Sequence, residues 1–307
     1  MSIPSLRGAQ VTIVEVGARD GLQNEAAVVR TDDKVAFIDQ LATAGLPVIE
    51  VGAFVNPKRV PQMGDTADVC ARLARRSDVR YTALVPNLVG LDRAEAAGLA
   101  DVAIFAAASE GFSRANINAG VDEAFSIYGE VCRQAIARGM RVRGYLSTAF
   151  GCPYDGEVAP ARVLTLTQRL LDMGVYEVAV SDTIGVAHPA QVAAVLEVLT
   201  AAVPVERLAL HFHDTRGTAL ANVLAGLLHG VRTFDAAAGG LGGCPFAPGA
   251  AGNLATEDLV YMLDGMGIST GVRLDRLVEA SRFIGTRIGH PLPSRCMQAV
   301  AGTRDRS

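Results

Sequence analysis

The chain has 307 residues, half of them hydrophobic and a fifth charged, a composition that can bury a large core and fits a single α/β barrel. The net charge of −4, with both signs well mixed, predicts no nucleic-acid partner, and the lack of an apolar run of about 20 residues predicts no membrane span. Five irregularly spaced cysteines, without a C-x-x-C pair or an N-terminal signal pattern, argue against disulfides and structural zinc and predict a cytoplasmic protein.

Strands and helices alternate along the chain. Apolar, β-branched runs predict eight strands, at residues 11–18, 47–54, 80–85, 101–107, 141–149, 176–181, 208–214 and 233–238. Helical patterns follow them, at residues 32–44, 66–74, 89–97, 121–138, 160–173, 189–201, 218–228 and 256–266. One more helix is predicted at 274–284, and the polar tail at 302–307 is predicted to be loose.

This alternation predicts a (β/α)8 TIM barrel with an additional C-terminal helical segment. A single catalytic domain would cover residues 1–307, with the barrel at about 11–270 and the C-terminal helix and tail at 271–307. An open doubly wound sheet usually carries a G-x-G-x-x-G turn after its first strand, whereas A-R-D-G-L-Q-N stands there in this chain (residues 18–24). The sequence therefore favours the barrel.

The barrel also predicts where the chemistry lies. Active sites of such barrels are built at the carboxyl ends of the strands, so polar residues at those ends are predicted to be functional. The glycine-rich loop at residues 239–253 follows the last strand and would bring Cys244 and Asn253 to the same end. The other polar residues at predicted strand ends are Arg19, Asp20, Glu50, Asn87, Ser109, Glu110, Ser147, Asp182, His211, His213 and Asp214.

Four of these residues predict a divalent metal site. His211 and His213 are two positions apart on one strand, so both imidazoles point the same way and can supply half of the site. The H-x-H pattern alone fits two hydrogen-bonded rim histidines equally well, but Asp20 comes from a strand only one removed in a closed barrel. The side-chain carbonyl oxygen of Asn253 would be a further ligand. This mixture of nitrogen and oxygen ligands suits Mg2+ or Mn2+ better than a tetrahedral zinc.

Motifs spread through the chain resemble the 3-hydroxy-3-methylglutaryl-CoA lyase family along nearly its full length. They are V-E-V-G-A-R-D-G-L-Q-N-E (14–25), V-P-Q-M-G-D (60–65), R-G-Y (143–145), G-C-P-Y (151–154), S-D-T-I-G-V (181–186), H-F-H-D-T (211–215), G-L-G-G-C-P (240–245) and G-N-L-A-T-E-D-L-V-Y-M-L (252–263). The resemblance implies a barrel fold, a divalent cation and a homodimer. It also implies cleavage of the acyl-CoA to acetyl-CoA and acetoacetate, in leucine and ketone-body catabolism.

The resemblance further implies roles for individual residues. Arg19 matches the arginine that stabilises the enolate, Glu50 an acidic group near metal and substrate, and Cys244 the catalytic cysteine of the glycine-rich loop. Fixed guanidinium donors would suit a thioester oxygen that becomes an enolate. Which proton transfer belongs to the cysteine, and which to a carboxylate or water, is left open, and a small buried thiol is the alternative for Cys244. The residues that match the metal ligands of the family are Asp20, His211, His213 and Asn253.

Gln23 and Asp182 are also predicted to contact the substrate. Gln23 lies in the loop after the first strand, where such residues are also common turn formers. Asp182, at the end of the sixth strand, could orient a ligand or a metal-bound water, or cap the following helix.

The sequence also bears on three other functions. The absence of hydroxyl residues after Glu50, where many family members carry them, leaves room for a related substrate such as citramalyl-CoA. A Claisen-condensing acyltransferase on the same metal frame generally adds a C-terminal region for which 307 residues leave no room. A Schiff-base aldolase needs a lysine on a strand, whereas Lys34 and Lys58 are predicted in a helix and a loop.

Overall fold

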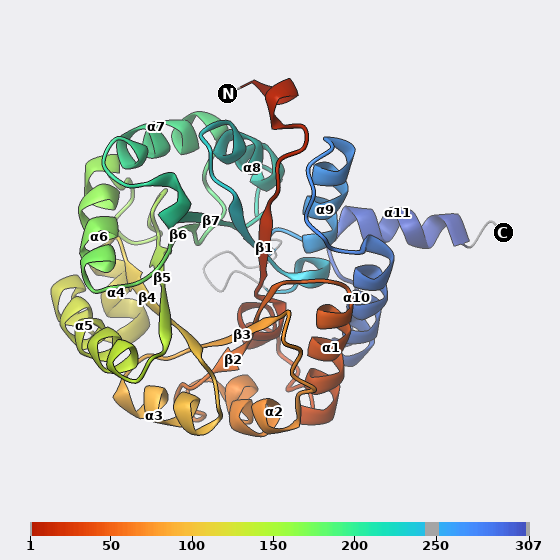
Figure 1. Cartoon of the computed structure of the whole chain (residues 1–307), viewed down its shortest axis with the longest axis horizontal. Coiled ribbons are helices and arrows are strands. Elements are labelled where there is room, and N and C mark those ends of the chain that lie inside the picture. The colour runs from red at the N-terminus through yellow and green to blue at the C-terminus, as the bar shows by residue number, and fades with distance from the viewer. Residues whose placement is uncertain (1, 243–251, 305–307) are drawn as a thin grey trace.

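Eight parallel strands close into a barrel, each hydrogen-bonded to the next and β8 to β1, with helices around the outside (Figure 1). The computed structural model describes residues 2–242 and 252–304. The predicted (β/α)8 fold is confirmed. The strands are β1 (Thr12–Glu15), β2 (Val48–Ala53), β3 (Arg80–Leu84), β4 (Asp101–Ala107), β5 (Arg141–Ser147), β6 (Val178–Asp182), β7 (Leu208–Phe212) and β8 (Thr233–Ala236).

Helices cover the outer face of the barrel. Short helical turns also occur at η1 (Ile3–Leu6), η2 (Gly17–Gly21), η3 (Pro61–Met63), η4 (Val205–Arg207) and η5 (Ala238–Gly240). None of the described helices is long and apolar enough to cross a membrane. The α-helices are α1 (Thr31–Thr43), α2 (Thr66–Arg72), α3 (Leu88–Ala96), α4 (Glu110–Ile117), α5 (Val121–Ala137), α6 (Pro160–Asp172), α7 (Pro189–Thr200), α8 (Ala219–Leu228), α9 (Thr256–Gly265), α10 (Leu274–Ile288) and α11 (Arg295–Arg304).

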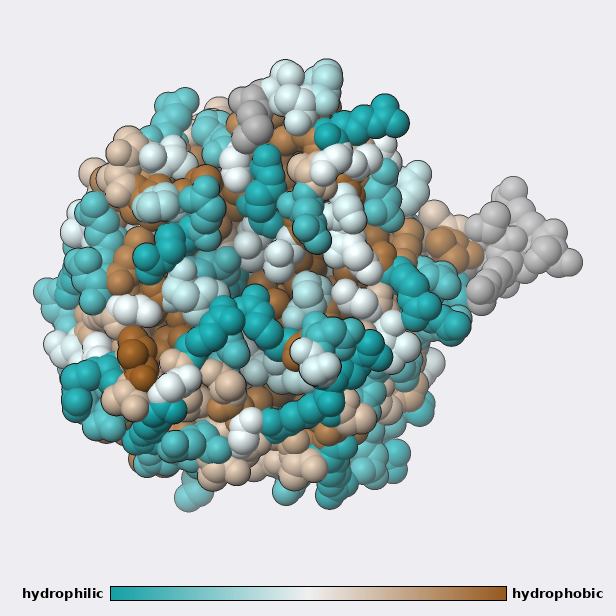
Figure 2. Space-filling view, in the orientation of Figure 1, coloured by the Kyte–Doolittle hydropathy of each residue, from teal (hydrophilic) through white to brown (hydrophobic). Residues whose placement is uncertain are grey.

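The strands read as nearly continuous apolar runs because both of their faces are buried, one in the barrel and one under the helices. All six residues of β2 are buried, and so are all five of β7. The helices bury one stripe each, as α1 does with Phe37, Ile38 and Leu41. On the face shown in Figure 2, hydrophilic side chains surround small separated areas of hydrophobic ones.

Several local predictions were wrong, and three of them concern short helical segments. The first strand ends at Glu15, and residues 17–21 form a single π-helical turn, in which the carbonyl of Val16 accepts hydrogen bonds from three amides. Helix α4 occupies a segment predicted as loop and buries Phe112. Helix α11 covers 302–304 of the tail predicted to be loose, because Asp258 of α9 accepts hydrogen bonds from the first two amides of α11. Each of these segments is held by contacts outside its own sequence.

Candidate active site

The π-helical turn η2 presents Arg19 and Asp20 at the carboxyl end of the barrel. The Glu15 carboxylate links the turn after β1 to the segment after β8. Its Oε1 accepts hydrogen bonds from the amides of Gly17 and Ala238, each at 2.8 Å. Gly21 leaves no room for a side chain, because a Cβ there would lie 2.6 Å from Cβ of Leu241. The turn after β1 is therefore packed directly against the start of the glycine-rich loop.

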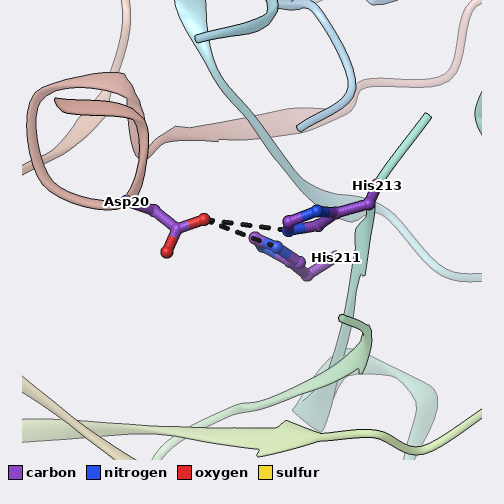
Figure 3. A group of neighbouring side chains, drawn as sticks. All are labelled: Asp20, His211 and His213. Atoms are coloured by element: carbon purple, nitrogen blue, oxygen red, sulfur yellow. Dashed lines mark ion pairs between the residues drawn. The ribbon is translucent and has the colours of Figure 1, made fainter. Parts of the chain in front are cut away.

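Asp20, His211 and His213 come together as a possible metal site (Figure 3), with one ligand atom of each within 4.8 Å of the others. Asp20 Oδ2 lies 4.0 Å from Nε2 of His211 and 3.9 Å from Nε2 of His213. These separations are too long for hydrogen bonds, but an ion about 2.1 Å from each ligand spans up to about 4.2 Å between them. The three side chains therefore fit a shared divalent cation.

Asn253 lies beside this group. Its backbone forms an isolated bridge with His213, which fixes the return of the glycine-rich loop to the end of β7. Its side-chain nitrogen donates to Asp20 Oδ2 at 3.0 Å and to the carbonyl of Leu241 at 3.1 Å. Its side-chain oxygen is buried and has no hydrogen-bond partner among the residues that the structure describes. The predicted ligand atom is thus a free acceptor, although the amide turns its nitrogen toward Asp20.

A chain of buried charges orients His211 from the side away from Asp20. His211 Nδ1 lies 3.2 Å from Oδ2 of Asp235 on β8, which leaves Nε2 directed at Asp20. Both oxygens of Asp235 accept from the guanidinium of Arg143, at 2.8 and 3.1 Å. Arg143 also donates to Glu177 at 2.7 Å. A carboxylate behind a ligating imidazole fixes its tautomer and raises its basicity.

Arg19 is held between two carboxylates. Its Nε donates to Glu50 Oε2 at 2.5 Å, and its Nη1 donates to Asp20 Oδ1 at 2.6 Å. The guanidinium also lies 5.3 Å from the ring centre of Tyr145, whose hydroxyl donates to Glu50 at 3.3 Å. Glu50 lies inside β2 and not at the strand end where it was predicted. Within residues 2–242 and 252–304, its other carboxylate oxygen has no hydrogen-bond partner.

Burial and neighbouring charges set the protonation of these groups. Burial would raise the pKa of Asp20, but Arg19 and the two histidines outweigh it and lower the pKa to about 2. Burial, together with the nearby His211, lowers the pKa of His213 to about 4. Burial raises the pKa of Glu50 despite its contact with Arg19. An ionised Asp20 and a neutral His213 are the forms that bind a cation.

A pocket of about 700 Å³ opens onto this group. Gln23 and Asn24 line it from the loop after η2, and Arg59 lines it from the loop after β2. Pockets of this size hold ligands comparable to a cofactor or drug. The other lining residues are Arg19, Asp20, Val55, Asn56, Val60, Leu84, Pro86, Asn87, Phe105, Phe112, Asn116, Ile117, Ala119, Ile127, Tyr128, Tyr145, Ser147, Ser181, Thr183, His211 and His213.

The remaining predicted residues differ in their placement. Both carboxylate oxygens of Asp182 accept backbone N–H groups, from Val186 at 3.0 Å and Ala187 at 2.9 Å. These bonds give Asp182 a turn-stabilising position, and it is not among the residues that line the pocket. Cys244 lies outside the described residues.

Sequence reasoning missed three side chains that build the site. Asp235 and Tyr145 contact predicted site residues, and Arg143 holds Asp235, yet none of the three was assigned a role. A signal was present for two of them, because R-G-Y at 143–145 places charge in an apolar strand. Asp235 is likewise an isolated charge in the strand T-F-D-A.

The closed barrel and the Asp20–His211–His213 group define a barrel enzyme with a candidate metal centre. The HMGL-like family model matches residues 10–284. The mitochondrial hydroxymethylglutaryl-CoA lyase of Bos taurus is 50% identical over 291 residues, which cover 95% of this chain and 90% of that protein. The chain therefore belongs to the HMGL-like family.

Solved structures agree. The HMG-CoA lyase of Bacillus subtilis has a TM-score of 0.95 at 47% identity, covering 96% of this chain and 99% of that one. An HMG-CoA lyase from Acinetobacter baumannii, solved in complex with coenzyme A and 3-methylmalate, has a TM-score of 0.90 at 40% identity and covers 94% and 95% of the two chains. The likeness thus extends over nearly the whole barrel.

Proposed function

We propose that this chain is a divalent-metal-dependent carbon–carbon lyase that cleaves 3-hydroxy-3-methylglutaryl-CoA to acetyl-CoA and acetoacetate. The observation that carries the proposal is the Asp20–His211–His213 group, placed beside the buried Arg19 at the base of a pocket of about 700 Å³. Relatives named hydroxymethylglutaryl-CoA lyase, about half identical to this chain over nearly all of its length, support the choice of substrate.

Asp20, His211 and His213 would hold the cation, with the side-chain oxygen of Asn253 as a further ligand after rotation of its amide. Mg2+ and Mn2+ are the cations that this mixed donor set favours. When bound, such an ion would chelate the hydroxyl and an adjacent oxygen of the substrate and act as a Lewis acid. The ionised Asp20 and the Asp235-oriented His211 keep the ligand atoms ready for it.

Arg19 is the proposed group that stabilises the enolate of the acetyl-CoA product. Its guanidinium is fixed by Glu50 and Asp20 before substrate arrives, so its donors need little reorganisation when negative charge develops on the thioester oxygen. Removing one fixed donor of this kind typically costs about 10²- to 10³-fold in turnover. In this proposal Glu50 holds the arginine by accepting from its Nε, and Tyr145 holds Glu50 by donating its hydroxyl.

Two proton transfers remain to be assigned. The substrate hydroxyl must lose a proton, and the acetyl-CoA enolate must gain one. Cys244 is proposed as the proton donor on its sequence context alone, between Gly243 and Pro245 in the glycine-rich loop. Glu50, with one unpartnered oxygen and a raised pKa, is a second group able to exchange a proton.

The pocket walls suit an acyl-CoA. Phe105, Phe112 and Tyr128 contribute aromatic rings to its lining, and Asn56 and Asn116 contribute amides. The relative solved with coenzyme A supports the assignment of an acyl-CoA ligand. Gln23 is proposed to contact it from the first loop, whereas Asp182 is proposed to act only through the backbone turn that it stabilises.

The proposal is tested by incubating the purified chain with 3-hydroxy-3-methylglutaryl-CoA and measuring acetyl-CoA and acetoacetate by mass spectrometry. We expect release of both products with Mg2+ or Mn2+ and less than about one per cent of that rate after chelation by EDTA, because the cation activates the hydroxyl. Restoring the cation should restore the rate. Activity that survives thorough chelation would contradict the metal mechanism.

A substrate panel in the same assay separates the alternatives. Faster cleavage of citramalyl-CoA would identify that compound as the substrate. Net condensation of acetyl-CoA with a keto acid would assign the chain to the acyltransferases.

Assembly as a homodimer, a cytoplasmic location and a place in leucine degradation are further parts of the proposal. Light scattering on the purified chain checks the first of these.

A further inference from the structure

The segment after α10 reaches back to the first loop of the barrel. His290 Nε2 lies 2.6 Å from Oε2 of Glu25, although the two residues are 265 positions apart. The Glu25 side chain is 9% exposed, and that of His290 is 49% exposed. The contact thus joins the C-terminal part of the chain to the residues that follow η2.

Both ring nitrogens of His290 face oxygen acceptors. Nε2 faces the Glu25 carboxylate, and Nδ1 lies 3.0 Å from the carbonyl oxygen of Pro291. A neutral imidazole donates through one nitrogen only, whereas an imidazolium donates through both. The two contacts therefore select the charged form of His290, which pairs with Glu25.

Glu25 is connected in turn to the substrate pocket. Its backbone carbonyl accepts from the side chain of Gln62 at 2.8 Å, and its amide donates to the carbonyl of Leu22 at 3.2 Å. Between these points, Gln23 and Asn24 line the pocket. Asn24 also donates to the backbone carbonyl of the residue that offers a metal ligand, Asp20, at 3.0 Å. A shift of Glu25 therefore moves side chains that line the pocket.

Two charged groups on the neighbouring helices are engaged with other partners. Arg287 donates to Asp33 at 2.9 Å, and Asp258 accepts hydrogen bonds at the start of α11. Glu25 is the acidic group that raises the pKa of His290. Charged side chains on the neighbouring elements include Arg282 and Arg287 of α10, Asp258 of α9, Arg295 of α11 and Asp33 of α1.

We propose that His290 is a positioning residue for the substrate pocket: its imidazolium holds Glu25 and, through it, the loop that carries Gln23 and Asn24. The kinetic consequence rests on the proposed lyase function, whereas the hold on the loop does not. Glu25 raises the pKa of His290 above its ordinary value of 6.5. The ion pair is therefore complete at pH values below 6.5 and is lost as the pH rises through the raised pKa.

Hydrogen exchange on the full chain, loaded with Mn2+, tests the hold on the loop without reference to activity. At pH 6.0 we expect the amides of residues 22–30 to exchange about threefold faster in His290→Gln than in the wild type, the size expected of a partly exposed ion pair. His290→Arg keeps charge and donors, so its loop should exchange like the wild type at pH 6.0 and more slowly than the wild type at pH 8.5. His229→Gln, at the end of α8, is the matched control and should leave residues 22–30 unchanged.

Kinetics with 3-hydroxy-3-methylglutaryl-CoA give the second readout. At pH 6.0, His290→Gln should raise KM about threefold with kcat within about twofold, and His290→Arg should keep the wild-type KM. Equal exchange of residues 22–30 in His290→Gln and the wild type overturns the proposal, and so does an equal KM in an active enzyme. A loop that loosens in a protein without lyase activity would instead uphold the positioning and refute the proposed function.

Discussion

His211 is the residue whose environment departs most from what its own sequence neighbourhood suggests. Its Nδ1 contacts Asp235, and Asp235 in turn accepts hydrogen bonds from both terminal nitrogens of Arg143. The ring nitrogen that His211 offers is thus set by residues 24 and 68 positions away in the chain. The orientation of the His211 imidazole therefore depends on side chains inside the barrel and not on the H-x-H motif alone.

We expect Asp235→Asn to weaken Mn2+ binding by about 10- to 100-fold, because the amide no longer fixes the ligating imidazole with a negative charge. Isothermal titration calorimetry on the purified chain measures this. The matched control is Glu177→Gln, which removes the other carboxylate partner of Arg143 without touching His211. Mn2+ affinity equal to that of the wild type in Asp235→Asn would show that Asp235 does not orient the ligand.

The part of the site that the sequence predicted well is the part that depends on strand order alone. Asp20, His211 and His213 meet because β7, β8 and β1 are neighbours in a closed barrel. The location of Glu50 at a strand end was wrong, since β2 continues for three residues beyond it. Partners such as Asp235 depend on side-chain directions inside the barrel, which apolar periodicity does not encode.

Among the elements, the π-helical turn η2 is the one that shapes the site. The pattern V-E-V-G-A predicts a continuing strand, but the carbonyl of Val16 instead accepts the amides of residues 19–21. Glu15 stabilises this geometry from within, through Gly17, Ala238 and the hydroxyl of Thr256, at 2.8, 2.8 and 2.6 Å. Strand propensity cannot show that a buried carboxylate accepts hydrogen bonds from the segments after two different strands. The turn was therefore not predicted.

The helices were predicted well where amphipathic spacing is strong and missed where tertiary contacts define them. Helix α10 was expected to end at 284 and continues to Ile288, where Gly289 takes a left-handed conformation with φ of 81°. Helices α4 and α11 were not predicted. Both are short, and α11 begins where Asp258 supplies the capping acceptor from another helix.

Helix α9 carries a second buried carboxylate that should make stability depend on pH. Burial raises the pKa of Glu257 to about 8, against the hydrogen bonds from Ser281 and Gly239. Because the pKa in the folded state lies above the ordinary value, the stability that protonation supplies is complete below about pH 4.5 and is lost as the pH rises through about 8.

We therefore expect Glu257→Gln to flatten the pH dependence of stability, since the neutral amide reproduces the protonated acid. The wild type should lose on the order of 1–3 kcal/mol of unfolding free energy between pH 5 and pH 8.5 that the variant retains. Urea unfolding at both pH values gives this difference. Glu197→Gln, an exposed change on α7, is the control. Parallel curves for the wild type and Glu257→Gln would contradict the assignment.

At the scale of the whole molecule, the candidate metal centre brings together segments that follow the first strand and the last two strands of the barrel. Asp20 follows β1, His213 follows β7, and Asn253 returns beside His213 after β8. A cation bound there contacts only the closed barrel and has no comparable site in an unfolded chain. Metal binding and closure of the β1–β8 seam are therefore linked.

We expect saturating Mn2+ to raise the melting temperature of the wild type by roughly 3–5 °C, because binding at about 100 times Kd contributes about 2.7 kcal/mol. His213→Ala should abolish most of this rise, since it removes one ligand from the group of three. Differential scanning calorimetry with and without Mn2+ measures the shift, with His229→Ala as the control. An equal shift in His213→Ala would exclude His213 as a ligand.

The spacing of the ligands also has a consequence for synthesis of the chain. Asp20 and His213 are separated by 193 positions, so an aspartate made early must wait for β7 before it has a partner. At about 5–20 residues per second, that interval is roughly 10–40 s on the ribosome. During this time the nascent chain presents a lone carboxylate, which is a weak ligand for any cation. An ion bound by this candidate site could thus be acquired only after the barrel is nearly complete, when the geometry of the finished site would select among ions.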